Sequence, residues 1–151
     1  MKKYIREILW GTFALYCVLL MWVLFFSREA ETMPLREYLC EYTSLLPFQT
    51  TLKYIRYIFL KRNIESVSLA LLNIGGNLLL FLPMGTFLPL LFPQIRRPAR
   101  FLLHIAAVIV SAEFAQAFLR LGIFDVDDIL YNFIGAFWGF SIKKAFRNIF
   151  R

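Results

Sequence analysis

The sequence predicts an all-α membrane protein with four transmembrane helices, and two observations support this fold class. Hydrophobic residues fill 60% of the 151 positions, which is far more than a soluble domain contains. They gather in long runs, and Lys and Arg flank these runs instead of forming one continuous patch. The basic balance of 17 Lys and Arg against 10 Asp and Glu therefore fits a membrane topology and argues against nucleic-acid binding.

The first three predicted spans follow directly from apolar runs. Residues 8–26 carry no charge and are long enough to cross the roughly 30 Å hydrocarbon layer as a helix. This run is long and has no Ala-x-Ala site, so an uncleaved span is favoured over a signal peptide. The second span is expected at 69–92, with Pro89 and Pro93 at its exit, and the third at 101–119, with Glu113 as its single formal charge.

The fourth predicted span, at 123–142, is short of uncharged residues. Only fourteen of them separate Asp128 from Lys143, whereas a span needs about twenty. We therefore expect Asp128 to lie below the headgroup level, with Lys143 and Lys144 snorkelling at the other end. Together the four spans form a single membrane domain over residues 1–151.

The distribution of basic residues predicts the orientation. Cytoplasmic ends retain Lys and Arg, and the N-terminus, the turn between spans two and three, and the C-terminal tail are rich in them. The residues concerned are Lys2, Lys3, Arg6, Arg96, Arg97, Arg100, Lys143, Lys144, Arg147 and Arg151. Both termini are therefore expected in the cytoplasm, which describes a multi-pass protein of the bacterial cytoplasmic membrane.

The connection 27–68 is then external, and it is too long to be a simple turn. Two apolar stripes at helical spacing lie on either side of Pro47 and predict interfacial helices. They are Leu35, Leu39, Tyr42 and Leu46, then Phe48, Leu52, Ile55 and Phe59. Basic residues beside the second stripe, Lys53, Arg56, Lys61 and Arg62, favour anionic headgroups. A helical cap packed over the bundle is an equally good interpretation.

Polar side chains recur inside the spans, where they are energetically costly, so each requires a reason. They occupy one face of each helix: Asn73 and Asn77, then Glu113, Gln116 and Arg120, then Asp128 and Asn132. At 1.5 Å per residue, Asn77 and Glu113 both lie on the order of 10 Å inside the outer boundary, with Asp125, Asp127 and Asp128 at the mouth. The sequence thus predicts one polar pocket open to the outside, formed by Asn77, Glu113, Gln116, Asp125, Asp128 and Asn132.

Glycines in the same spans are predicted to bring helices close together. Gly76, Gly85, Gly135 and Gly139 fall in the second and fourth spans, and the last two form a G-x-x-x-G pair. The polar residues have a purely structural interpretation as well, in which they hydrogen-bond across helices and hold the bundle together. Intramembrane carboxylates are nevertheless functional candidates by default, and Glu113 is the foremost of them here.

At these residues the chain resembles a known family, the VanZ-like membrane proteins, named for a teicoplanin-resistance protein. The signature E-x-x-Q and D-x-x-D-x-x-x-N-x-x-G-x-x-x-G is similar to Glu113-x-x-Gln116 followed by Asp125, Asp128, Asn132, Gly135 and Gly139. The family segment N-x-x-x-F-x-P-x-G is similar to Asn77, Phe81, Pro83 and Gly85. The family's N-L-I-P-F element has Ser44 at its Asn position, and Ile123 stands where many members have Arg. The resemblance implies a link to resistance against lipid-anchored glycopeptides.

These features are compatible with three functions. The first is an envelope protein whose pocket binds a lipoglycopeptide or a lipid-linked envelope component. The second is an intramembrane enzyme acting on a lipid headgroup, with Glu113 as general base and Asp125 and Asp128 holding a divalent cation. The third is a small transporter or accessory subunit, which would require an oligomer. We expect membrane lipids as partners and no nucleic acid; apart from that cation, we expect no cofactor.

Overall fold

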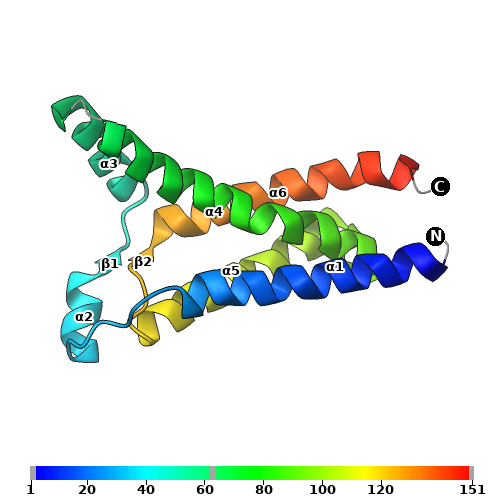
Figure 1. Cartoon of the computed structure of the whole chain (residues 1–151), viewed down its shortest axis with the longest axis horizontal. Helices are drawn as coiled ribbons and strands as arrows, with labels where there is room; N and C mark the ends of the chain where they lie inside the picture. The colour runs from blue at the N-terminus through cyan, green and yellow to red at the C-terminus, as the bar shows by residue number, and fades with distance from the viewer. Residues whose placement is uncertain (1–2, 62–63, 150–151) are drawn as a thin grey trace.

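Four long helices lie side by side in an elongated bundle in the computed structural model, which describes residues 3–61 and 64–149, with side chains through Ile142. They are α1 (Lys3–Met21), α4 (Ile64–Leu91), α5 (Pro98–Phe118) and α6 (Val126–Ile149). The start of α1 and the end of α6 lie at the same end of the bundle (Figure 1). The side chains of Lys143 and Lys144, predicted to snorkel, lie outside the described part, as do Lys2, Arg62 and Arg151.

Three of the described helices are long and apolar enough to cross a membrane. They are Lys3–Phe26, in which α1 continues into the π-helix η1 (Trp22–Phe26), then α4 and α5. The chain is therefore mostly helical and has the helices of a membrane protein. Helix α6 opens with Asp127 and Asp128 in its first turn. Its role as a fourth span, and the orientation of the bundle, stay predictions.

The other end of the bundle, which we call the distal end, carries the long connection between α1 and α4 (Figure 1). This connection contains α2 (Leu35–Glu41) and α3 (Gln49–Lys61), so helices form where the two apolar stripes predicted them. Helix α2 ends before Tyr42 and Leu46, the last two positions of its stripe. Helix α3 packs against α4 and α6 and leaves Leu52 and Phe59 exposed on its other side.

A very short parallel sheet joins this connection to the beginning of α6. Strand β1 (Thr43–Ser44) pairs with β2 (Phe124–Asp125), with Thr43 opposite Phe124 and Ser44 opposite Asp125. The Phe124 amide also donates to the Tyr42 carbonyl at 3.0 Å. Segments about eighty residues apart in the chain are thereby held together at the distal end.

Helices α4 and α6 form the most extensive helix pair of the bundle, and glycines explain their closeness. A Cβ added to Gly85 would overlap the Ala136 carbonyl, and one added to Gly135 or Gly139 would overlap the carbonyl of Leu78 or Leu82. Only residues without a side chain permit this backbone contact. Gly76 does not make the close helix contact predicted for it, because nothing lies within 4 Å of a Cβ built there.

The apolar core fills the bundle between the distal end and the termini. Phe101, Ile105 and Ile109 of α5 are fully buried, and Phe101 stacks on Phe140 of α6 with ring centroids 4.2 Å apart. Helix α4 continues through Pro89, which the sequence placed at its exit, and Pro93 begins the 3-10 turn η2 (Pro93–Arg96) before α5. The buried polar side chains lie outside this core, toward the distal end.

Candidate functional site

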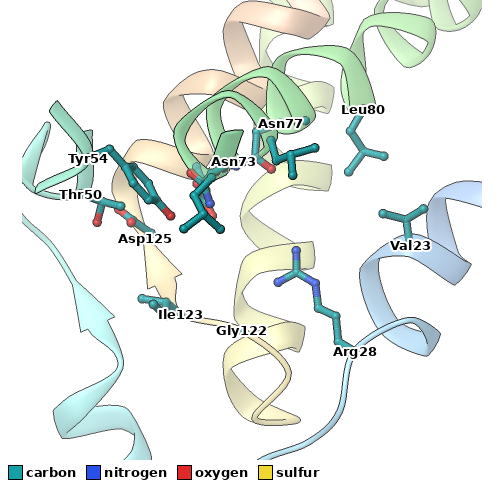
Figure 2. Close-up of a pocket in the computed structure, with 14 residues that line it drawn as sticks. Val23, Arg28, Thr50, Tyr54, Asn73, Asn77, Leu80, Gly122, Ile123 and Asp125 are labelled. Atoms are coloured by element: carbon teal, nitrogen blue, oxygen red, sulfur yellow. Dashed lines mark hydrogen bonds between the residues drawn. The ribbon is translucent and has the colours of Figure 1, made fainter. Parts of the chain in front are cut away.

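A cleft of about 560 Å³ opens at the distal end, between α3, α4, the start of α6 and the segment that follows η1. We call it the polar cleft, because side chains of both charges face it together with amides and a phenol. Its polar lining consists of Arg28, Thr50, Tyr54, Asn73, Asn77, Asp125 and Asp128 (Figure 2). Valine, leucine and isoleucine side chains complete the lining, so the cleft has both apolar and charged walls.

The acidic side of the polar cleft is built at the start of α6. The Asn77 side-chain amide donates to Asp128 Oδ1 at 2.6 Å, which fixes this carboxylate against α4. Asp125 is only 2% exposed, and its Oδ1 accepts the Asp127 backbone N–H at 2.9 Å. Asp128 therefore presents its second oxygen to the cleft, and Asp125 supports the turn that begins α6.

Asp127 has a structural role that differs from its expected place at the pocket mouth. Its carboxylate is buried and accepts backbone N–H groups of Phe48 and Thr51, as well as the Thr51 hydroxyl at 2.8 Å. Phe48 immediately precedes α3 and Thr51 lies in its first turn, where a carboxylate satisfies free donors and complements the helix dipole. Phe48 adopts a left-handed φ of 64° to make this approach. Asp127 thus anchors α3 on α6.

Arg28 forms the basic side of the polar cleft and points from the segment after η1 toward the Asn73–Asn77 face of α4 (Figure 2). Its guanidinium lies against Gly122, where an added Cβ would stand 2.5 Å from Nη1. It is close enough to act electrostatically on Asp128 and Glu113. Among the described residues the Arg28 side chain has no hydrogen-bond partner, and it is exposed where it lines the cleft.

Sequence reasoning missed Arg28, although a signal was present: it is the first basic residue after the first span, two positions past Phe26. The sequence places a different arginine, Arg120, on the same helix face as Glu113. Arg120 adopts a left-handed φ of 59°, and its Nη1 donates to the Met33 carbonyl at 2.8 Å. The turn beyond α5 is held further by Tyr38, whose hydroxyl donates to the Gly122 carbonyl at 2.7 Å.

Three of the predicted pocket residues lie behind the polar cleft instead of lining it. Glu113 and Asn132 are 4% and 2% exposed and face each other across α5 and α6, with Asn132 Nδ2 at 3.5 Å from Glu113 Oε1. In the described part of the chain, Asn132 Oδ1 has no hydrogen-bond partner. The Gln116 amide donates to the Leu24 carbonyl of η1 at 3.0 Å. The predicted cluster is therefore divided into two layers.

Tyr54, which the sequence did not single out, extends from α3 over the cleft beside Thr50. Burial raises the pKa of its phenol, and the nearby carboxylates of Asp128 and Asp125 raise it further. Its hydroxyl is consequently neutral at physiological pH and available as donor or acceptor. For the candidate metal ligands Asp125 and Asp128, the described residues hold no group of three or more His, Cys, Asp or Glu able to share a metal ion.

Comparison with known proteins places the chain in a family. The sequence profile of VanZ/LLP1 matches residues 13–147, which include every residue of the polar cleft. The chain belongs to the VanZ/LLP1 family. Within this family it is similar to Protein VanZ of Enterococcus faecium, with 24% identity over 132 residues that cover 87% of this chain and 71% of that protein. No solved structure matches the VanZ/LLP1 chain described here.

Proposed function

We propose that this protein belongs to the cell envelope and lowers susceptibility to lipoglycopeptide antibiotics such as teicoplanin. In this proposal the polar cleft faces the outside and binds the drug or a lipid-linked envelope component. Family membership and the similarity to Protein VanZ support the direction of the proposal. The observation that carries it is the Arg28 guanidinium, which has no hydrogen-bond partner among the described residues and faces Asp128 across an open cleft.

The Arg28 side chain is exposed and lines the polar cleft. A guanidinium carries five N–H donors, and those of the exposed Arg28 side chain, which has no hydrogen-bond partner among the described residues, are open to water or to a ligand that enters the cleft. Direct contact with Asp128 would close the cleft, but that carboxylate is held by Asn77 on the other wall. The cleft therefore keeps donors and acceptors apart, as a binding site for a polar group does.

Binding is favoured over catalysis by the place of Glu113. As a general base it would have to reach the proton of a bound substrate within hydrogen-bond distance. Its carboxylate is 4% exposed, faces Asn132 and does not line the polar cleft. The side chains that do line the cleft are suited to recognition of a charged group.

The proposal is tested by expressing the wild type in a teicoplanin-sensitive Gram-positive host and measuring the minimum inhibitory concentration. We expect an increase for teicoplanin that exceeds the increase for a glycopeptide without an acyl chain. Arg28→Gln should abolish most of that increase, because it removes the unpaired cation of the cleft.

The matched control is Arg36→Gln, since Arg36 is an exposed arginine of α2 that does not line the cleft. It should retain the full increase, at equal protein abundance in the membrane. No difference between cells with wild type and empty vector would refute the resistance function. Equal resistance with Arg28→Gln would refute the role of the cleft.

A further inference from the structure

A second hollow of about 350 Å³ lies between α3 and α4, and it is almost entirely apolar. We call it the apolar groove; its lining includes Ile55 and Ile58 of α3 and Ala70, Leu71, Ile74 and Gly75 of α4. Nothing lies within 4 Å of a Cβ built on Gly75, so the groove is open at this point. The groove has the dimensions and chemistry of a channel for a hydrocarbon chain.

Tyr54 lines both the apolar groove and the polar cleft. A tyrosine suits such a junction, because its ring is apolar and its hydroxyl is polar. The two hollows are therefore neighbours on either side of one side chain, as Figure 2 shows for the cleft side of Tyr54. A molecule that occupies both must be an amphiphile, with a polar head in the cleft and a chain in the groove.

The charges of the cleft restrict the head further. Arg28 offers a planar set of N–H donors, which binds phosphate oxygens well. On the facing wall, Asp125, Asp128 and Asn73 supply oxygen acceptors, which suit a group rich in N–H donors. A head that has an anionic phosphate and a primary ammonium satisfies both walls at once. A head with only negative charge would face two carboxylates against one guanidinium.

We propose that the polar cleft and the apolar groove together bind one membrane phospholipid with a zwitterionic head. Its phosphate lies on Arg28, its primary ammonium lies on the Asp128 side, and one acyl chain runs between α3 and α4 past Tyr54. This inference rests on the proposed function in one respect, that the cleft binds a ligand. It identifies that ligand as a membrane phospholipid, and the drug itself is the alternative that the test distinguishes.

The test uses the purified full-length protein and native mass spectrometry with three probes: phosphatidylethanolamine, phosphatidylcholine and phosphatidylglycerol of identical acyl chains. We expect phosphatidylethanolamine to bind most tightly, because phosphatidylcholine lacks N–H donors and phosphatidylglycerol lacks the cation. Arg28→Gln should weaken its binding about tenfold, the effect of one charge-assisted hydrogen bond. Arg36→Gln should leave the binding unchanged.

Gly75→Leu tests the proposed position of the acyl chain independently of the lipid head group. The new side chain enters open space, so the helix should still fold, while it fills the groove that the acyl chain needs. We expect about tenfold weaker binding, which corresponds to losing roughly two buried methylene groups. Gly11→Leu is the matched control, because a Cβ there also meets nothing within 4 Å and Gly11 lines neither hollow. It should bind as the wild type does.

The outcomes separate this inference from the proposed function. Equal binding of the three phospholipids, or unchanged binding by Arg28→Gln and Gly75→Leu, would overturn the inference, and resistance in cells would still be measured separately. Binding of teicoplanin to the wild type but not to Arg28→Gln, without phospholipid selectivity, would also overturn it and would leave the proposed function standing.

Discussion

The three carboxylates at the start of α6 have different structural roles, although they lie within four consecutive positions of the chain. Asp125 supports the turn through the Asp127 N–H, Asp127 caps α3, and Asp128 is held by Asn77 with one side toward the polar cleft. The differences arise from direction, because consecutive residues at the start of a helix point to different neighbours. One short acidic segment therefore joins α3, α4 and α6 at the cleft.

At this scale, Asp127→Ala should release α3 from the bundle. The substitution leaves the amides of Phe48 and Thr51 without their acceptor and removes an N-cap, which costs about 2 kcal/mol of stability. We expect a lower midpoint of thermal unfolding in detergent and faster tryptic cleavage at Lys53 and Arg56 of α3. Asp127→Asn keeps one oxygen acceptor, so its unfolding midpoint and its cleavage rate should lie between those of the wild type and Asp127→Ala. Wild-type cleavage rates in Asp127→Ala would contradict the anchoring role.

Residue spacing in the sequence identified the polar faces but not the partner of each side chain. Helical periodicity places Asn77, Asp128 and Asn132 on inner faces, and the structure brings Asn77 and Asp128 into contact. Helical periodicity could not separate the residues that line the cleft from those in the layer behind it, because both sets lie on the inner faces of their helices. Arg28 and Tyr54 were missed because they lie in the long connection, whose folding onto the bundle depends on distant contacts such as Ser44 opposite Asp125.

At the scale of elements, the α4–α6 pair is the rigid part that carries the site. Gly85, Gly135 and Gly139 permit backbone contact between these helices, and this contact fixes Asn77 beside Asp128. The sequence pattern predicted close approach at these glycines, and also at Gly76. Gly76 lines the polar cleft instead, because α4 and α6 separate toward the distal end where the cleft opens.

Gly135→Leu should therefore disrupt the bundle, whereas Gly75→Leu should not. The new side chain at 135 would overlap the Leu78 carbonyl, a backbone atom that cannot move without displacing α4. Overpacking of this kind costs about 3 kcal/mol or more. We expect loss of monodisperse protein on size-exclusion chromatography and a strongly lowered unfolding midpoint for Gly135→Leu. A stable, well-folded Gly135→Leu protein would show that α4 and α6 are not in backbone contact.

At the scale of the whole molecule, the positions of the termini and of the distal end determine which side of the membrane the polar cleft faces. The start of α1 and the end of α6 lie together, opposite α2 and α3 (Figure 1). An even number of crossings follows if α6 spans the membrane, and the basic residues near the termini predict that this end is cytoplasmic. The polar cleft would then face the outside, where lipoglycopeptides act.

The native cysteines allow this orientation to be tested without introducing new cysteines. Cys40 is exposed on α2 at the distal end, whereas Cys17 lies half-buried within α1. A membrane-impermeant maleimide should label Cys40 in intact cells, and Cys40→Ser should abolish the signal. Labelling of Cys40 only after lysis would reverse the predicted orientation and place the polar cleft in the cytoplasm.

We propose the polar cleft as a ligand site organised by Arg28 on one wall and Asp128 on the other. This proposal is tested most directly by an experimental structure of the protein in a lipid bilayer. We expect density for a charged head between Arg28 and Asp128, continuing past Tyr54 into the apolar groove. A cleft closed by a direct Arg28–Asp128 ion pair, with no density between the walls, would contradict it.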